Sequence, residues 1–163
     1  MTQSSPEQLE NRLWRELTGS TFAFVGLFND PHGDVPMTLF SQADPREGLW
    51  IFTKKDNAIA SGGTAMARLI TKGQDFFARL DGALVAEKDD ALIDALWSPG
   101  IAAWYPGGRH DPELIVMRFD LAAAELWSGK MSPLAVAKML LGKSVAPTAQ
   151  QGHVMLTPPD QTG

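Results

Sequence analysis

Cysteine is absent from all 163 positions of the chain, and its absence removes several classes of chemistry. Disulfide frameworks, thiolate nucleophiles and zinc or iron–sulfur sites built on cysteine all need that side chain. Histidine is scarce as well, because His32, His110 and His153 stand far apart and form no metal-binding spacing. We therefore expect no metal site, and any redox chemistry has to come from a bound cofactor.

The chain also lacks long apolar runs and an excess of positive charge. No apolar segment approaches the roughly 20 residues that a membrane-spanning helix needs, and Met1–Glu10 does not have the basic and then apolar pattern of a signal peptide. A net charge of −5 and a pI near 5.1 argue against general binding to nucleic acid. We expect a cytoplasmic protein that binds neither membrane nor nucleic acid, folded as one domain over residues 1–163.

Short β-prone segments separated by turn residues make up most of the chain. This pattern predicts a mainly β fold with peripheral helices, arranged as a small antiparallel barrel. The expected strands are Thr21–Phe28, Val35–Ser41, Leu49–Thr53, Thr64–Ile70, Asp75–Ala86 and Glu113–Asp120. Their expected core residues are Phe22, Phe24, Leu39, Ile51, Leu69, Leu80 and Val116.

Helix signals occur at both ends and in the middle of the chain. Ser5, Pro6 and Gln8 form a capping box with proline at the first helical position. The leucines that follow at four-residue spacing predict one buried stripe: Leu9, Leu13 and Leu17. A short helix is expected over Asp89–Trp97, with Ala91, Leu92, Ala95 and Leu96 on its buried side. A last helix is expected over about 132–142, followed by a mobile tail from about residue 143.

Three large aromatic residues, Trp97, Trp104 and Tyr105, lie in one Pro/Gly-rich connection. Proline fixes φ, glycine supplies backbone angles that other residues avoid, and large rings seldom stay in water without a surface to cover. We expect an ordered loop, which either covers one end of the barrel or closes over a ligand.

Several segments carry a resemblance to a known family. They are Leu13–Leu17 (LWREL), Val35–Thr38 (VPMT), Gly48–Thr53 (GLWIFT), Leu96–Pro112 with its WYPGG sequence, and Ala124–Trp127 (AELW). In this order and spacing, the chain resembles the general-stress-protein branch of the pyridoxamine-5′-phosphate-oxidase-like flavin split barrels. The similarity runs from roughly Pro6 to Leu156. It implies a homodimer of six-stranded antiparallel split barrels, with FMN, or sometimes FAD, bound at the subunit interface.

The resemblance also assigns candidate flavin contacts. They are Val35, Pro36, Met37 and Thr38 in the first segment, and Phe52, Thr53, Lys54, Lys55 and Asn57 in the second. Trp127 is either a flavin neighbour or an anchor of the dimer interface. The chain departs from the family pattern at two phosphate-binding positions, because Val35 replaces an arginine and Ile59 replaces a lysine. We expect Lys55, or else Lys54, to supply the missing charge.

Three function classes stay open. The chain is a flavin-dependent redox protein, a flavin carrier or sensor without turnover, or a split barrel that has lost its cofactor. The second class is suggested because no catalytic acid, base or nucleophile stands out, and the third by Val35 and Ile59. Oxidation of pyridoxamine phosphate itself is not expected, since the arginine-rich C-terminal motif of those oxidases has no match after Glu125.

Overall fold

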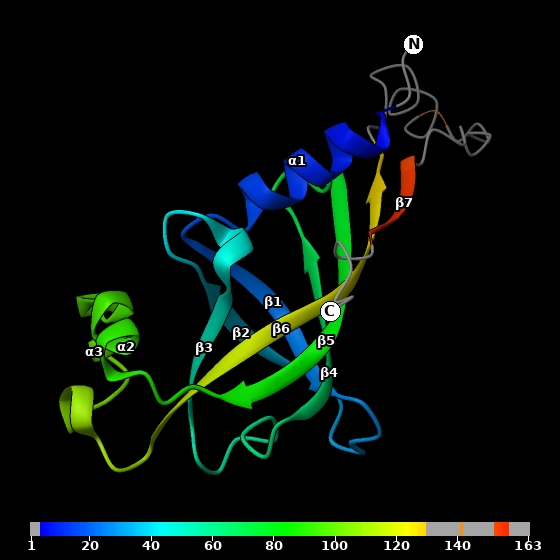
Figure 1. Cartoon of the computed structure of the whole chain (residues 1–163). Helices are drawn as coiled ribbons and strands as arrows, with labels where there is room; N and C mark the ends of the chain where they lie inside the picture. Colours follow the sequence, from blue (N-terminus) through cyan, green and yellow to red (C-terminus); the bar gives the residue numbers. More distant parts are fainter. Residues whose placement is uncertain (1–3, 130–140, 142–151, 157–163) are drawn as a thin grey trace, which may run out of the picture.

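Six strands of the computed structural model close into an antiparallel barrel (Figure 1), as the sequence predicts. The structure describes residues 4–129, 141 and 152–156. The sheet order is β3-β2-β1-β4-β5-β6-β7, and pairing of β3 with β6 closes the barrel. The strands are β1 (Ser20–Leu27), β2 (Val35–Phe40), β3 (Leu49–Lys54), β4 (Gly63–Ile70), β5 (Phe76–Ala86), β6 (Leu114–Ser128) and β7 (Gly152–Leu156).

Helix α1 (Pro6–Glu16) lies across one end of the barrel (Figure 1). It begins with the predicted capping box, in which the Gln8 amide donates to the Ser5 hydroxyl and the Ser5 amide donates to Gln8 Oε1. The predicted leucine stripe is almost fully buried: Leu9, Leu13 and Leu17. These side chains belong to the main core, so α1 fills the barrel end that the strands leave open.

The barrel interior is lined by many small side chains. Inward-facing alanines come from four strands: Ala23, Ala65, Ala67, Ala78 and Ala124. Leu39, Ile51, Leu69, Leu80 and Val116 are buried as predicted. The prediction for Phe22 and Phe24 is wrong, because they are 82% and 57% exposed. Successive strand residues face opposite sides, and β1 turns Ala23 and Val25 inward because a barrel of this size has little interior volume.

Strand β6 is longer than predicted, and it continues past the barrel to pair with β7. The register shifts between Asp81 and Gly82 of β5, opposite the extra residue Ala122 of β6, and this bulge lets the two strands stay paired while they bend. Gly82 is needed there, since a Cβ atom would lie 2.1 Å from the carbonyl oxygen of Asp120. Residues 152–156 of the expected tail form β7, so this part is a strand of the sheet. The helix expected over 132–142 lies outside the described residues, apart from Leu141.

The segment between β5 and β6 forms short helices, namely α2 (Asp90–Leu96), α3 (Pro99–Ala102) and the 3-10 turn η2 (Gly108–His110). The aromatic connection is therefore ordered, as predicted. Asp89 caps α2 by accepting from the Leu92 amide. The buried residue of α2 is Ile93, whereas Ala91 and Ala95 are exposed, so the predicted buried side is partly wrong. Ile93 faces β3 and β6, where it forms a cluster with Trp50 and Val116.

Candidate functional site

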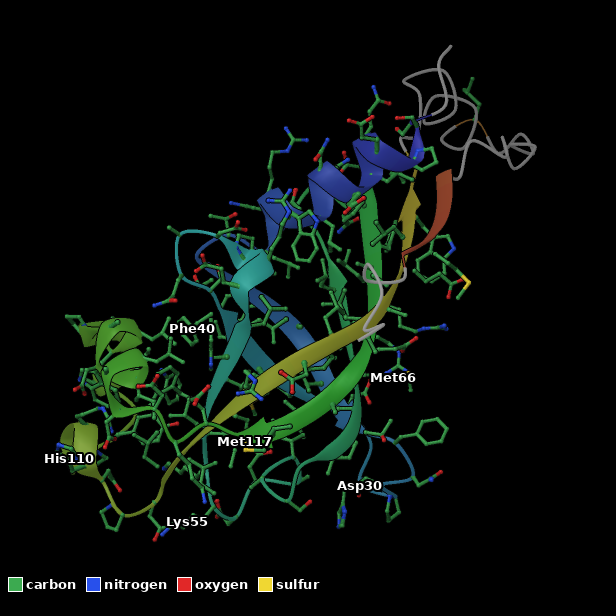
Figure 2. The ribbon with its side chains drawn as sticks, in the orientation of Figure 1. Asp30, Phe40, Lys55, Met66, His110 and Met117 are labelled. Atoms are coloured by element: carbon green, nitrogen blue, oxygen red, sulfur yellow. The ribbon has the colours of Figure 1, made fainter. Side chains whose placement is uncertain are left out.

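The two predicted flavin-contacting segments lie on neighbouring strands, β2 and β3. These strands pair only through Phe40 and Trp50, while β3 pairs along its whole length with β6. Phe40, the last residue of β2, lies beside the start of β3, and Lys55 follows the other end of β3 (Figure 2). Residues 35–38 and 52–55 therefore belong to the part of the barrel where β2 and β3 are not joined by a ladder. The predicted contacts thus lie beyond the single point at which β2 and β3 pair.

Side chains of the predicted contacts divide between the two sides of the sheet. Val35 and Met37 pack against the main core, and Thr53 is buried at 4% exposure. Pro36 is exposed on the outer side of β2, and Phe52 lies on the outer side of β3. Because neighbours along a strand alternate in direction, the predicted residues that share the outer side are Pro36, Thr38, Phe52 and Lys54.

The ring of Phe52 is part of an aromatic chain outside the barrel. It meets Phe40 edge-on at 5.6 Å and Trp97 at 6.0 Å, and Trp97 meets Tyr105 at 6.1 Å. Burial, with the Asp111 carboxylate nearby, raises the pKa of Tyr105 to about 12, so its hydroxyl keeps its proton. The aromatic connection thus covers β3, and Phe52 packs against its own chain on at least two sides.

A polar cluster fixes this cover to the barrel. The indole N–H of Trp50 donates to Glu87 Oε2 at 3.1 Å, and Arg118 lies 3.5 Å from the same oxygen. Burial by itself would raise the pKa of Glu87. Hydrogen bonds from Trp50 and from the amides of Asp89 and Lys88, with the charge of Arg118, outweigh burial and hold that pKa below its usual value. We call the outer side of β3 and of residues 114–118 the covered face.

Lys54, the last residue of β3, and Lys55, which follows it, are both exposed, as a phosphate-binding role requires. The Lys55 amide donates to the carbonyl of Glu113 at 3.0 Å, which fixes its position beside the loop before β6. Amides of Glu113 and Gly107 lower the pKa of Asp111, and the charge of Lys54 adds to this effect. Lys54 therefore already faces a carboxylate, whereas Lys55 is held mainly through its backbone.

Asn57 and Ile59 have local structural roles. Asn57 Oδ1 accepts from the Ile59 amide at 3.1 Å, and the Asn57 amide donates to the Lys54 carbonyl at 3.0 Å. These bonds close the turn after β3. Ile59 is fully buried in the main core. Ile59 is therefore a core residue and cannot itself contact a phosphate.

Trp127 does not join the other predicted contacts within one chain. It lies near the end of β6, opposite Phe77 of β5 and His153 of β7. Lys54 pairs with Leu114, at the other end of the same strand. Thirteen residues at about 3.3 Å each separate the two ends by about 40 Å along the strand. A single chain therefore cannot bring Trp127 and Lys54 to one small ligand.

Sequence reasoning missed an exposed apolar surface on the outer side of β1 and β4, which we call the bare face. Phe22, Phe24 and Ile70 are 82%, 57% and 63% exposed. Across the β1–β2 ladder, Phe22 lies opposite Thr38 and Phe24 lies opposite Pro36. The bare face is thus continuous with the outward predicted contacts. The inward residues of the neighbouring strand β4 include two alanines, Ala65 and Ala67. This preference for small interior residues is the signal that could have placed Ala23, and not Phe22 or Phe24, inside the barrel.

Charged side chains adjoin the bare face. Arg68 lies opposite Phe24 on one side and Arg79 on the other, and it pairs with Asp34. Arg79 pairs with Glu125 at 2.8 Å. Its Nε atom lies 3.5 Å from Asp81 Oδ1, too poorly placed for a hydrogen bond, and both atoms are buried without a hydrogen-bond partner. The carboxylates offset the repulsion between two arginines on facing strands.

Two classes of site are not seen in the described part of the chain. Residues 4–129, 141 and 152–156 contain no group of three or more His, Cys, Asp or Glu side chains that could hold a metal ion. Over the same ranges, no helix is long and apolar enough to cross a membrane.

A six-stranded antiparallel split barrel with a helical cover on one outer face defines the class of protein. Residues 8–150 match the family described as "Pyridoxamine 5′-phosphate oxidase like", and this chain belongs to that family. Among curated proteins, no match is found.

Solved structures of general stress proteins are similar to the chain. A general stress family protein from Xanthomonas campestris pv. campestris is 34% identical, with a TM-score of 0.71. The match covers 81% of this chain and 93% of the Xanthomonas chain. The general stress FMN/FAD binding protein from Xanthomonas citri is also 34% identical, with a TM-score of 0.71 and coverages of 77% and 92%. General stress protein 26 from Jannaschia sp. CCS1 shares the fold, with a TM-score of 0.71 at 20% identity. The match covers 93% of this chain and 99% of the Jannaschia chain.

Proposed function

We propose that this chain is a flavin-binding redox protein that works as a homodimer, with FMN held between two copies. The observation that carries the proposal is the bare face, where large apolar side chains stand exposed beside Pro36 and Thr38. Exposed apolar patches of this kind mark interaction surfaces. The Xanthomonas citri relative is described as an FMN/FAD binding protein, which supports a flavin as the ligand.

A homodimer also resolves the separation between the predicted contacts. Trp127 lies about 40 Å along β6 from the pair of Lys54 and Leu114, so one chain cannot use both at one ligand. In a symmetric dimer, each copy presents the same surface to the other. We propose that Trp127 of one copy approaches the Pro36 and Thr38 side of the other.

The side chains near Pro36 and Thr38 are of the chemical types that a flavin ring and its phosphate need. The isoalloxazine ring needs apolar and aromatic surface, which Phe22, Phe24 and Pro36 offer on the outer side. The phosphate needs cations and hydrogen-bond donors. Ile59 and Val35 pack against the core, so we assign the phosphate charge to Lys55, with Lys54 as the second choice.

When bound, the flavin would supply the electron-transfer chemistry, and the protein would supply binding, orientation and exclusion of water. Thr38, half-buried on β2, would donate a hydrogen bond from its hydroxyl to the ligand. Phe22 and Phe24 would exclude water once a second copy covers them. The Xanthomonas relatives are described as general stress proteins, which supports a stress-related role as part of the proposal.

A split barrel without cofactor is the second candidate function, and the burial of Ile59 favours it. Loss of the two charged phosphate contacts expected at positions 35 and 59, each worth roughly 1.5–3 kcal/mol, would weaken flavin binding about a hundredfold or more unless other cations take their place. A flavin carrier or sensor without turnover is the third, because the described site contains no evident proton-transfer pair.

Visible absorbance of the purified protein and a mass spectrum of its denatured extract separate these functions. We expect flavin absorbance and an FMN mass, and an FAD mass instead would change the cofactor but keep the class. A colourless protein that does not take up added FMN or FAD would support the barrel without cofactor. Stopped-flow reduction by nicotinamide cofactors, followed by reoxidation with dioxygen, then divides a redox protein from a carrier.

A further inference from the structure

A concave surface lies between α1 and the 3-10 turn η1 (Pro45–Glu47), away from the predicted flavin contacts. This groove has a volume of about 520 Å³. It is lined by Asn11, Trp14, Arg15, Thr18, Ala43, Asp44, Pro45 and Arg46. It adjoins the Leu49 end of β3, whereas Lys54 lies at the other end, about 16 Å along the strand.

An indole and a guanidinium form one wall of the groove. The guanidinium of Arg46 lies 5.3 Å from the centre of the Trp14 ring. The Trp14 indole N–H donates to Glu10 at 3.3 Å, which holds the ring in place. Flat π-surfaces of this kind accept a further planar ring, because guanidinium and aromatic planes both stack.

Two arginines, Arg15 and Arg46, line the groove. Arg15 is exposed, and within residues 4–129 no ion pair or hydrogen bond engages its guanidinium. Arg46 has a long contact of 3.5 Å with Asp44 Oδ1, an oxygen that already accepts from the Arg46 amide at 2.9 Å. The carboxylates of Asp44 and Glu10 balance the two guanidiniums in number, but they engage the Arg46 side and the Trp14 indole and not Arg15. Both arginines can donate paired hydrogen bonds to a planar oxyanion.

From this geometry we infer that the groove between α1 and η1 binds a planar aromatic molecule that carries a carboxylate or a phosphate. The ring lies against Trp14 and Arg46, and the oxyanion is held by Arg15 and Arg46. Asn11 and Thr18 line the groove with further polar groups. This site is independent of flavin binding at β2 and β3.

The test uses the Trp14 indole as a reporter in heteronuclear NMR of the whole chain. The Trp14 signal is assigned by its loss in Trp14→Phe. Two probes are titrated separately, 1-naphthoate for the carboxylate and adenosine monophosphate for the phosphate. We expect saturable shifts of the Trp14 signal with a dissociation constant of about 1 mM or tighter for at least one probe.

Matched variants separate the site from general charge effects. Arg15→Gln and Arg46→Gln should each weaken binding about tenfold, as loss of a charged hydrogen bond does. Lys72→Gln removes the same charge from an exposed turn between β4 and β5 and should leave binding unchanged. Circular dichroism checks that all variants stay folded. No shift with either probe up to about 10 mM, or equal weakening by Lys72→Gln, would overturn the inference.

Discussion

The barrel has two apolar outer faces, and only one of them is covered by the described chain. On the covered face, Trp50, Ile93 and Val116 are at most 5% exposed, because α2 and its following loop pack over them. On the bare face, Phe22 is 82% exposed and Phe24 is 57% exposed. Burying a large apolar side chain is worth about 1.5–3 kcal/mol. Our proposal is that a second copy of the chain covers the bare face.

The largest expected effect is on the covered face. Trp50→Ala removes a buried indole and its hydrogen bond to Glu87, and should lower the free energy of unfolding by about 3–5 kcal/mol. Trp104→Ala is the control, because Trp104 is 75% exposed, and it should change stability by less than about 0.5 kcal/mol. Urea unfolding followed by circular dichroism measures both. Similar losses for the two variants would show that the cover is packed differently.

The next effect is on the bare face and concerns association. The double change Phe22→Glu and Phe24→Glu places four charges in the symmetric interface and should raise the dimer dissociation constant about a hundredfold or more. Far-ultraviolet circular dichroism should stay as in the wild type, because both side chains already face solvent in one chain. Sedimentation velocity measures the association. A variant that remains as dimeric as the wild type would exclude the bare face from the interface.

A smaller effect is expected at the proposed phosphate subsite, which follows β3. Lys55→Glu reverses a charge after β3 and should raise the dissociation constant for FMN at least about tenfold. Lys72→Glu makes the same reversal in an exposed turn between β4 and β5 and should have little effect. Flavin fluorescence titration compares the two. Equal and negligible effects would place the phosphate elsewhere.

The smallest effect concerns acid stability of the covered face. The folded-state pKa of Glu87 is held below its ordinary value of 4.5, so its contribution to stability is present above pH 4.5 and is lost as pH falls through the folded pKa. Glu87→Gln removes this titration. Its free energy of unfolding should therefore fall less steeply below pH 4.5 than that of the wild type. Parallel curves would show that Glu87 does not stabilise the fold through its charge.

Much of the fold could be predicted because local signals agreed with the packing. The capping box at Ser5 and the leucine stripe that follows predict where α1 begins and which side it buries. The turn residues predict where the strands begin and end along the chain. The phase of β1 could not be predicted by hydrophobicity, since Phe22 and Phe24 alternate with apolar Ala23 and Val25. Only the narrow barrel interior decides between these two faces.

The candidate site was harder to predict than the fold, because a family pattern does not say where a side chain points. The family pattern selects segments on the neighbouring strands β2 and β3, which pair through Phe40 and Trp50 alone, and their role as flavin contacts stays a prediction. The core positions of Val35 and Ile59 and the separation of Trp127 from Lys54 depend on tertiary packing and on the length of β6. These features have no local signal in the sequence.

Sedimentation equilibrium of the wild-type protein, recorded at micromolar concentration with flavin absorbance and protein absorbance together, tests the central claim most directly. We predict one species of twice the 17.7 kDa chain mass, carrying flavin in a ratio of one per chain. A 17.7 kDa species that retains flavin would contradict the claim that the bare face of two copies forms the binding site.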